Sequence, residues 1–441
     1  MSSEPGSSTV APTPALESFA ALLRKRPTDI LSPRREQAMR RLLGLGLPGS
    51  RDDSWRYTSL RAIAARRFGE AAVPAGHETT APRSWLRDCG GEPLVLCNGY
   101  LRPVTAAARP GLEIRSLREL AAADPQFLAS KLTSASDAED ERWSMLNEAL
   151  LTDGLYLRIH APLAEPLLIV HAAEGGPTDA AIHSRLIVDL APGARATILE
   201  HDVGSAGPAV LANRATRIEL ARGSEIEHYR IVSAEPKGLR FDALELHQGR
   251  DSRSRLYTVV LGGGLVRADA RVRLDEPGAE HEGAALLVGR DARHVDCVHG
   301  VVHAAAHTLS RQTFRAIGAG TSRVVVNSKV LVENGAAGSE SRQSCRGLLL
   351  SPTAEIDTRP QLEINADEVK CAHGATTGRL DPDMLFYLLS RGIDRSAAQS
   401  LLVFAFLDDV LTGMGLANAR RAIEDALIAE LPDAELLRAF R

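Results

Sequence analysis

Aromatic side chains are scarce in this 441-residue chain: Phe, Trp and Tyr make up 4% of it, although its apolar fraction is 44%. Any large core must therefore consist mainly of Ala, Val, Ile and Leu. Lysine is scarcer still, and none of the five lysines follows a glycine: Lys25, Lys131, Lys237, Lys329 and Lys370. Because a phosphate-binding P-loop requires Gly-Lys followed by Ser or Thr, the sequence excludes an ATP site of that type.

Cysteine and long apolar runs are also scarce. Five cysteines, an odd number, do not suggest a disulfide framework in a chain of this length. The N-terminal residues lack a basic segment followed by an apolar run, so no secretory leader is expected. No window approaches the 18 apolar residues of a membrane span. The net charge of −4 gives no general attraction to nucleic acid or to an anionic membrane. Together these features predict a cytoplasmic protein.

Hydrophobic periodicity divides the chain into regions. Leu16, Phe19, Ala20 and Leu23 recur with a helical period, whereas the middle of the chain contains successive short, alternating strands separated by small turn pieces. A helical period returns after Asp381-Pro382, which suits an N-cap and first helical residue. We therefore expect a disordered tail at 1–15, a mainly helical region at 16–150, a β region at 151–376 and a helical domain at 377–441.

The β region shows loose self-similarity. The segments DLAPGARATI, ELARGSEIEH, LLSPTAEIDT and INADEVKCAH each place a turn of small residues before an alternating strand. Stacked coils with aliphatic inward residues suit this pattern, because each coil packs on like residues above and below it. The sequence thus favours a mainly β fold with a parallel β-helix core, and a β-sandwich remains the alternative.

Histidines are concentrated between 294 and 307. His299, His303 and His307 are four residues apart, so on a helix they would share a face that could bind zinc. A helix near 291–306 is one alternative. On a strand, residues four apart are too far from each other for these histidines to bind one ion. In that case we expect them to be hydrogen-bonded polar side chains instead.

The segment LEINADEVKCAHGATTGRL carries the main candidate site, Cys371 and His373. On a strand, residues two apart face the same way, about 6.5 Å apart. Both side chains could therefore point at one metal ion or cluster. Two ligands cannot hold a metal alone, so the pair predicts a half-site that a second protein completes.

The second helix of the C-terminal domain is apolar on more than one face. Burial against neighbouring elements and docking of a partner protein are both compatible with this pattern. The residues concerned are Phe404, Phe406, Leu407, Asp409, Val410 and Leu411.

Several motifs resemble the SufB/SufD family of the SUF iron–sulfur cluster assembly system, and its SufD members most of all. The segments that carry the resemblance are Gln343-Ser-Cys-Arg346, Pro360-Gln-Leu-Glu-Ile364, Asp367 to Thr376, Phe386-Tyr-Leu388 with Ser390 to Ile393, and Trp55-Arg-Tyr-Thr58. Gly374 stands where SufB-type members carry a glutamate after the corresponding histidine, which favours the SufD type. Ser328, where glycine is frequent, departs from the family pattern and is not expected to touch the site.

The resemblance implies a right-handed parallel β-helix flanked by helical regions, acting as a non-catalytic scaffold. It implies a SufB-like paralogue paired along the β-helix edge and a SufC-like ABC-type ATPase docked on the C-terminal helices through the residues from Phe404 to Leu411. It also implies a transient iron–sulfur cluster shared with the paralogue, with His373 as a metal ligand and Cys371 beside it. Reduced flavin in the complex and a homodimer in isolation are further possibilities that this resemblance leaves open.

A carbohydrate-active β-solenoid enzyme is the alternative from another functional class. It would use carboxylates such as Asp269, Asp275 and Glu282 on one coil face. Such enzymes usually carry stacked aromatic side chains in a cleft, and this chain has few. A homodimeric SufB-type scaffold is the other alternative, and Gly374 disfavours it.

Overall fold

The computed structural model describes residues 12–73, 84–104, 109–132, 140–174, 178–204 and 209–429. Most of the tail expected at 1–15 lies outside these residues, as does the end of the C-terminal domain. The first helix begins at Pro14, inside the range expected to be a tail.

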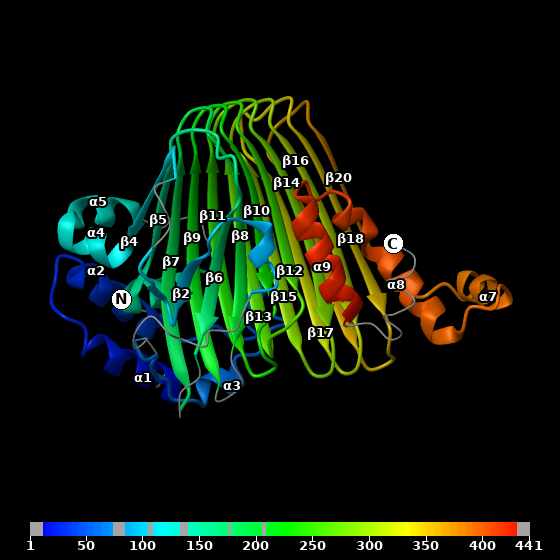
Figure 1. Cartoon of the computed structure of the whole chain (residues 1–441), viewed down its shortest axis with the longest axis horizontal. Helices are drawn as coiled ribbons and strands as arrows, with labels where there is room; N and C mark the ends of the chain where they lie inside the picture. The colour runs from blue at the N-terminus through cyan, green and yellow to red at the C-terminus, as the bar shows by residue number, and fades with distance from the viewer. Residues whose placement is uncertain are drawn as a thin grey trace, which may run out of the picture.

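The centre of the molecule is a β-solenoid whose chain alternates between two sheets (Figure 1). One sheet contains β5 (Asp153–Ile159), β7 (Ala180–Leu190), β9 (Val210–Leu220), β11 (Leu239–Gln248), β13 (Leu265–Leu274), β15 (His294–His303), β17 (Arg323–Val332) and β19 (Glu355–Ile364). The other contains β6 (Leu167–Ala173), β8 (Arg195–Gly204), β10 (Glu225–Val232), β12 (Arg253–Val260), β14 (Glu280–Gly289), β16 (Leu309–Gly318), β18 (Glu340–Leu349) and β20 (Lys370–Arg379).

The two ends of the solenoid differ. At the first end, β4 (Leu112–Ser116) pairs antiparallel with β5, and β3 (Tyr100–Leu101) pairs antiparallel with β2 (Leu94–Cys97), which lies beside β6. The short β1 (Gly69–Glu70) adds to β7. At the other end, β19 and β20 pair only with the preceding coil among the described strands. Their outer edges therefore present unpaired backbone groups, a template for another chain.

Aliphatic residues fill the solenoid because inward positions recur every second residue and parallel pairing stacks them in register. One unbroken column runs through eight coils, each member lying beside the next: Leu157, Val188, Ile218, Leu246, Val272, Val301, Val330 and Leu362. All but Leu362 are fully buried. The predicted mainly β solenoid with an Ala/Val/Ile/Leu core is confirmed.

The N-terminal helices cover the outer face of the first sheet. Phe19, Trp55 and Trp143 form a cluster with Leu211 and Phe241, which point outward from β9 and β11. The helices are α1 (Pro14–Leu23), α2 (Ser32–Leu45), α3 (Arg61–Ala64), α4 (Leu117–Ala123), α5 (Pro125–Lys131) and α6 (Arg142–Leu150).

The C-terminal helices cover the outer face of the second sheet. Residues on α8 (Arg395–Leu411) and α9 (Ala417–Ala429) pack on outward side chains such as Tyr229 and Leu286. The short α7 (Pro382–Ser390), coloured orange in Figure 1, projects from the end of the solenoid. Asp381 caps α7 as predicted, since its carboxylate accepts the backbone N–H of Asp383 at 2.8 Å.

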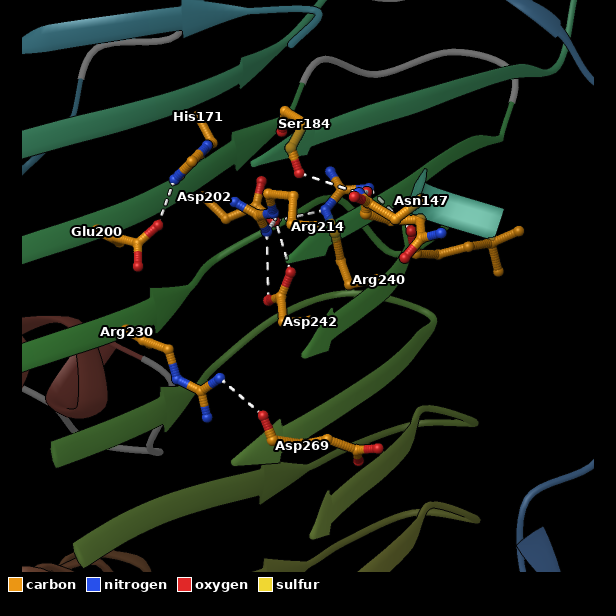
Figure 2. A network of polar contacts seen from close by, with 12 residues as sticks. Asn147, His171, Ser184, Glu200, Asp202, Arg214, Arg230, Arg240, Asp242 and Asp269 are labelled. Carbon is orange, nitrogen blue, oxygen red and sulfur yellow. Dashed lines mark hydrogen bonds and ion pairs between the residues drawn. The ribbon is translucent and has the colours of Figure 1, made fainter. Parts of the chain in front are cut away.

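Charged side chains also lie inside the first half of the solenoid (Figure 2). Asp202 accepts from Nε of Arg240 at 2.6 Å and contacts Arg214, which in turn donates to Asp242 at 2.9 Å. Burial raises the pKa of Asp202, but the two guanidiniums outweigh that effect and hold it below its ordinary value. The buried Glu200 carboxylate is hydrogen-bonded to His171 at 2.6 Å and to His228 at 2.8 Å.

Across the described residues, no helix has the length and apolar character needed to cross a membrane.

Candidate functional site at the open end of the solenoid

Cys371 and His373 lie on β20, the terminal strand of the second sheet, as the sequence predicts. They are two residues apart and face the same side of the strand, about 6.5 Å from each other. β20 pairs with β18 on one side, and no described strand pairs with its other edge. The pair therefore occupies the open end of the solenoid.

The two side chains differ in their surroundings. Cys371 is half-buried and packs against the aliphatic interior near Leu362 and Val369. Burial raises the pKa of its thiol, and a backbone hydrogen bond from Ser341 opposes this shift. His373 is exposed. Because a metal binds the thiolate rather than the thiol, the exposed imidazole is the more accessible ligand of the two.

The pair does not form a complete metal centre within this chain. No group of three or more His, Cys, Asp or Glu residues with metal-binding geometry occurs among the described residues. Gly374, beside His373, has open space around it, with no atom within 4 Å of where a Cβ would lie. The described residues therefore leave the two potential ligands at an unpaired strand edge open to further ligands from another molecule.

Two inward-facing columns of polar residues lead along the second sheet to this pair. In the first, His281, Ser310, Ser341 and Cys371 are neighbours on successive strands, and Ser310 and Ser341 share a hydrogen bond of 2.9 Å. In the second, Gln312, Gln343 and His373 are neighbours. Sequence patterns did not indicate that these serines and glutamines lie beside the pair, because only the register of distant strands brings them together.

The three histidines spaced by four do not share a helix. The segment 294–303 is strand β15, so the helix considered near 291–306 is wrong. His303 is hydrogen-bonded to Thr308 and Ser310, each at 2.8 Å, and His299 contacts His281 at 3.0 Å. These buried imidazoles are satisfied by polar neighbours, as expected for the strand alternative.

The residues expected to dock an ATPase lie on α8, and several face inward. Leu407, Val410 and Leu411 are buried against the second sheet, so a partner cannot reach them in this conformation. Asp409 forms an ion pair with Arg315 of β16. Phe404 and Phe406 are partly buried beside the same cluster.

Exposed apolar side chains gather instead on α7. Met384, Phe386 and Tyr387 are 58%, 71% and 57% exposed, and α7 buries none of its residues. Exposed aromatic residues on one short helix mark a protein-binding surface more often than scattered single residues do. We call these three residues the α7 patch.

The carboxylates considered for a carbohydrate-active site do not share a face. Asp269 lies on β13 of the first sheet and Asp275 just after the end of that strand, whereas Glu282 lies on β14 in the second sheet. Asp269 and Asp275 also pair with Arg267 and Arg273. This arrangement does not support glycosidase chemistry, which requires two carboxyl groups flanking one bond.

A hollow of about 490 Å³ lies on the outer face of the first sheet, over Gly300 and between Arg271 and Lys329. Its lining contains no Phe, Tyr or Trp on which a flavin ring could stack. The hollow therefore gives no support to flavin binding on this face.

Comparison with known proteins places these observations in a family. A family model described as the SufBD core domain of SUF system FeS cluster assembly matches residues 171–406, and one for the SufBD N-terminal region matches residues 16–164. An iron–sulfur cluster assembly SufBD family protein from Synechocystis is 30% identical over 88% of this chain and 89% of its own length. The iron–sulfur cluster assembly protein SufD from Escherichia coli is 29% identical over 87% and 90%, respectively. SufD from Bacillus subtilis is 21% identical over 65% and 66%.

Proposed function

The chain belongs to the SufBD family of iron–sulfur cluster assembly proteins, and on that premise we propose that it is the SufD-type scaffold subunit of a SufB–SufC–SufD complex. In this proposal it helps to build or receive the nascent cluster at an interface with a SufB-like paralogue. The observation that carries the proposal is the incomplete Cys371–His373 pair on an unpaired strand at the end of the solenoid.

The paralogue joins along the free edges of β19 and β20. β20 is mostly exposed and β19 is mostly half-buried, in contrast to the buried strands of the preceding coils. Added strands would satisfy the free backbone groups and bring further ligands beside His373. The nascent cluster is cargo in this scheme, and the second subunit completes its coordination. The same edge could pair two copies of this chain when the paralogue is missing.

The ATPase docks on the C-terminal domain. The α7 patch offers apolar surface, and α8 connects it to the outer face of the second sheet, whose last strand carries His373. A nucleotide-driven movement of the ATPase would therefore be transmitted through α8 to the sheet that holds the site. ATP itself binds the partner, since this chain lacks a P-loop.

The test is coexpression with SufB-like and SufC-like partners, followed by anaerobic cluster reconstitution monitored by visible absorbance. His373→Ala should lower cluster content severalfold without changing the size of the complex or its unfolding midpoint. Cys371→Ser should have a smaller effect, because the Cys371 thiol is half-buried and its pKa is raised.

His160→Ala is the matched control, since it removes an exposed imidazole beyond the end of β5. Normal reconstitution by the His373→Ala variant would refute the role of the site. Failure of the chain to associate with either partner would refute the scaffold assignment.

A further inference from the structure

A directional chain of hydrogen bonds inside the last coils ends at the strand beside His373. The Ser328 hydroxyl donates to Oε1 of Gln312 at 2.6 Å. A serine has a single hydroxyl hydrogen, so this hydroxyl can only accept from its other neighbour. That neighbour is Gln343, whose side-chain NH₂ donates to Ser328 at 2.7 Å. With Gln312 presenting its carbonyl oxygen to Ser328, Gln343 presents its NH₂ to Ser328 and its own carbonyl oxygen faces away.

The carbonyl oxygen of Gln343 is left over at the end of this chain. It is buried and has no hydrogen-bond partner among the described residues, and the whole of Gln343 is only 2% exposed. A buried acceptor without a donor is unfavourable, because it has lost its hydrogen bonds to water. A donor at this position would therefore be held strongly.

His373 is the group that the fold places there. The register pairs Gln343 with Gln312 on one side and with His373 on the other, and all three face the same side of the sheet. On the Gln312 side, Ser328 bridges the two amides, and the Gln312 NH₂ that is left over donates to no described acceptor, Gln343 included. Neighbouring strands are about 4.8 Å apart, so a histidine N–H can reach a glutamine oxygen across them.

We propose that Gln343 is a positioning residue for His373: its carbonyl oxygen accepts one ring N–H, which fixes the tautomer and leaves the lone pair of the other ring nitrogen for a metal. Metal-binding histidines commonly donate their second nitrogen to a carbonyl in this way. The metal-binding role of this hydrogen bond rests on the proposed function, whereas the existence of the hydrogen bond does not. Ser328 does not touch the Cys371–His373 pair, but only the Gln343 side chain separates it from His373.

The first measurement is the tautomer of His373 by NMR in full-length chain labelled with ¹⁵N-histidine, with the His373→Ala spectrum assigning the signal. We expect one tautomer in the unchanged protein and a mixture in Gln343→Met, which keeps the volume and removes the polar atoms. Gln343→Glu, which retains an accepting oxygen, should restore the single tautomer.

The second measurement is the Zn²⁺ affinity of the same full-length variants in complex with the SufB-like partner, which supplies the further ligands that the pair lacks. Loss of such an outer hydrogen-bond acceptor weakens metal binding by about 10–100-fold, so Gln343→Met should bind Zn²⁺ about tenfold less tightly. Ser328→Ala, which removes only the hydroxyl that anchors Gln343, should act in the same direction. It also keeps the inference testable if Gln343→Met does not fold.

An unchanged tautomer and unchanged Zn²⁺ affinity in both Gln343→Met and Ser328→Ala would overturn the inference. That outcome, combined with lost cluster assembly in His373→Ala, would support the proposed function and reject the role of Gln343. A tautomer change in Gln343→Met together with normal assembly by His373→Ala would support the hydrogen bond and reject the function.

Discussion

Arg315 on β16 forms an ion pair with Asp409 on α8 and so ties the C-terminal helices to the sheet that ends in the candidate site. The Arg315 side chain is almost fully buried, whereas that of Asp409 is about half-exposed. The guanidinium also lies 5.9 Å from the ring centroid of Phe406. An ATPase docked on the C-terminal helices would act on the solenoid through α8, and this contact joins α8 to the second sheet.

Asp409→Asn should loosen α8, because it leaves the buried Arg315 without its counter-charge, at a cost of about 1–3 kcal/mol. Hydrogen exchange should become faster in residues 395–411 while the solenoid strands stay protected. Asp408→Asn is the matched control, since it removes the same charge from an exposed neighbour. Equal exchange in the two variants would show that the pair does not hold the helix.

The interior Asp202 should contribute far more to stability than a surface acid. Asp202→Asn leaves Arg214 and Arg240 buried with one carboxylate fewer, and breaking such a buried pair costs roughly 3–5 kcal/mol. Urea unfolding followed by far-UV circular dichroism measures the loss. Glu36→Gln, in the exposed Arg40–Glu36 pair, should change stability by less than about 0.5 kcal/mol. A similar loss of stability in Asp202→Asn and Glu36→Gln would contradict a stabilising role for the buried network.

The buried histidines should make the fold sensitive to mild acid. Burial lowers the pKa of His303 to about 4, from about 6.5 when unfolded. Because the pKa of His303 is lower in the folded chain than in the unfolded chain, the neutral imidazole makes its full contribution to stability above about pH 6.5. That contribution is lost as the pH falls toward 4, because the unfolded chain takes up the proton first. His299 acts in the same direction, with a pKa lowered by burial to about 3.

His303→Gln should therefore reduce the pH dependence of stability between about pH 6.5 and 4, by about 1.4 kcal/mol per pH unit. The amide can still hydrogen-bond to Thr308 or Ser310, which hold the imidazole now. Urea midpoints at a series of pH values measure the slope. His160→Gln, at an exposed position, controls for replacing an imidazole with an amide. An unchanged slope in His303→Gln would contradict the prediction.

The solenoid could be predicted from the sequence because inward positions repeat every second residue. The position of Cys371 and His373 on one face of a terminal strand could be predicted because they are two residues apart. The residues that lie beside this pair could not be predicted from the sequence. Ser328, Gln343 and His373 come together through pairing between successive coils, which the uneven spacing of the repeats does not reveal. Arg315 and Asp409 are 94 residues apart.

The residues of α8 show why apolar pattern alone cannot identify a docking surface. Val410 and Leu411 have the apolar character of a docking face, but that face is covered by the chain's own second sheet. Burial by an intramolecular neighbour and burial by a partner need the same residue types, so only the structure separates them. The α7 patch remains uncovered by the described residues.

Phe386→Ala should therefore weaken binding of a SufC-like ATPase, because this ring is 71% exposed and offers the largest uncovered apolar area on α7. Truncating a central aromatic contact often costs 2 kcal/mol or more, or about 30-fold in affinity. Calorimetric titration of the full-length chain with the ATPase measures the change. Leu45→Ala, at a 55% exposed leucine on α2, is the control and should leave the affinity unchanged. Unchanged binding by Phe386→Ala, with loss of binding on Phe406→Ala, would instead return the docking site to α8.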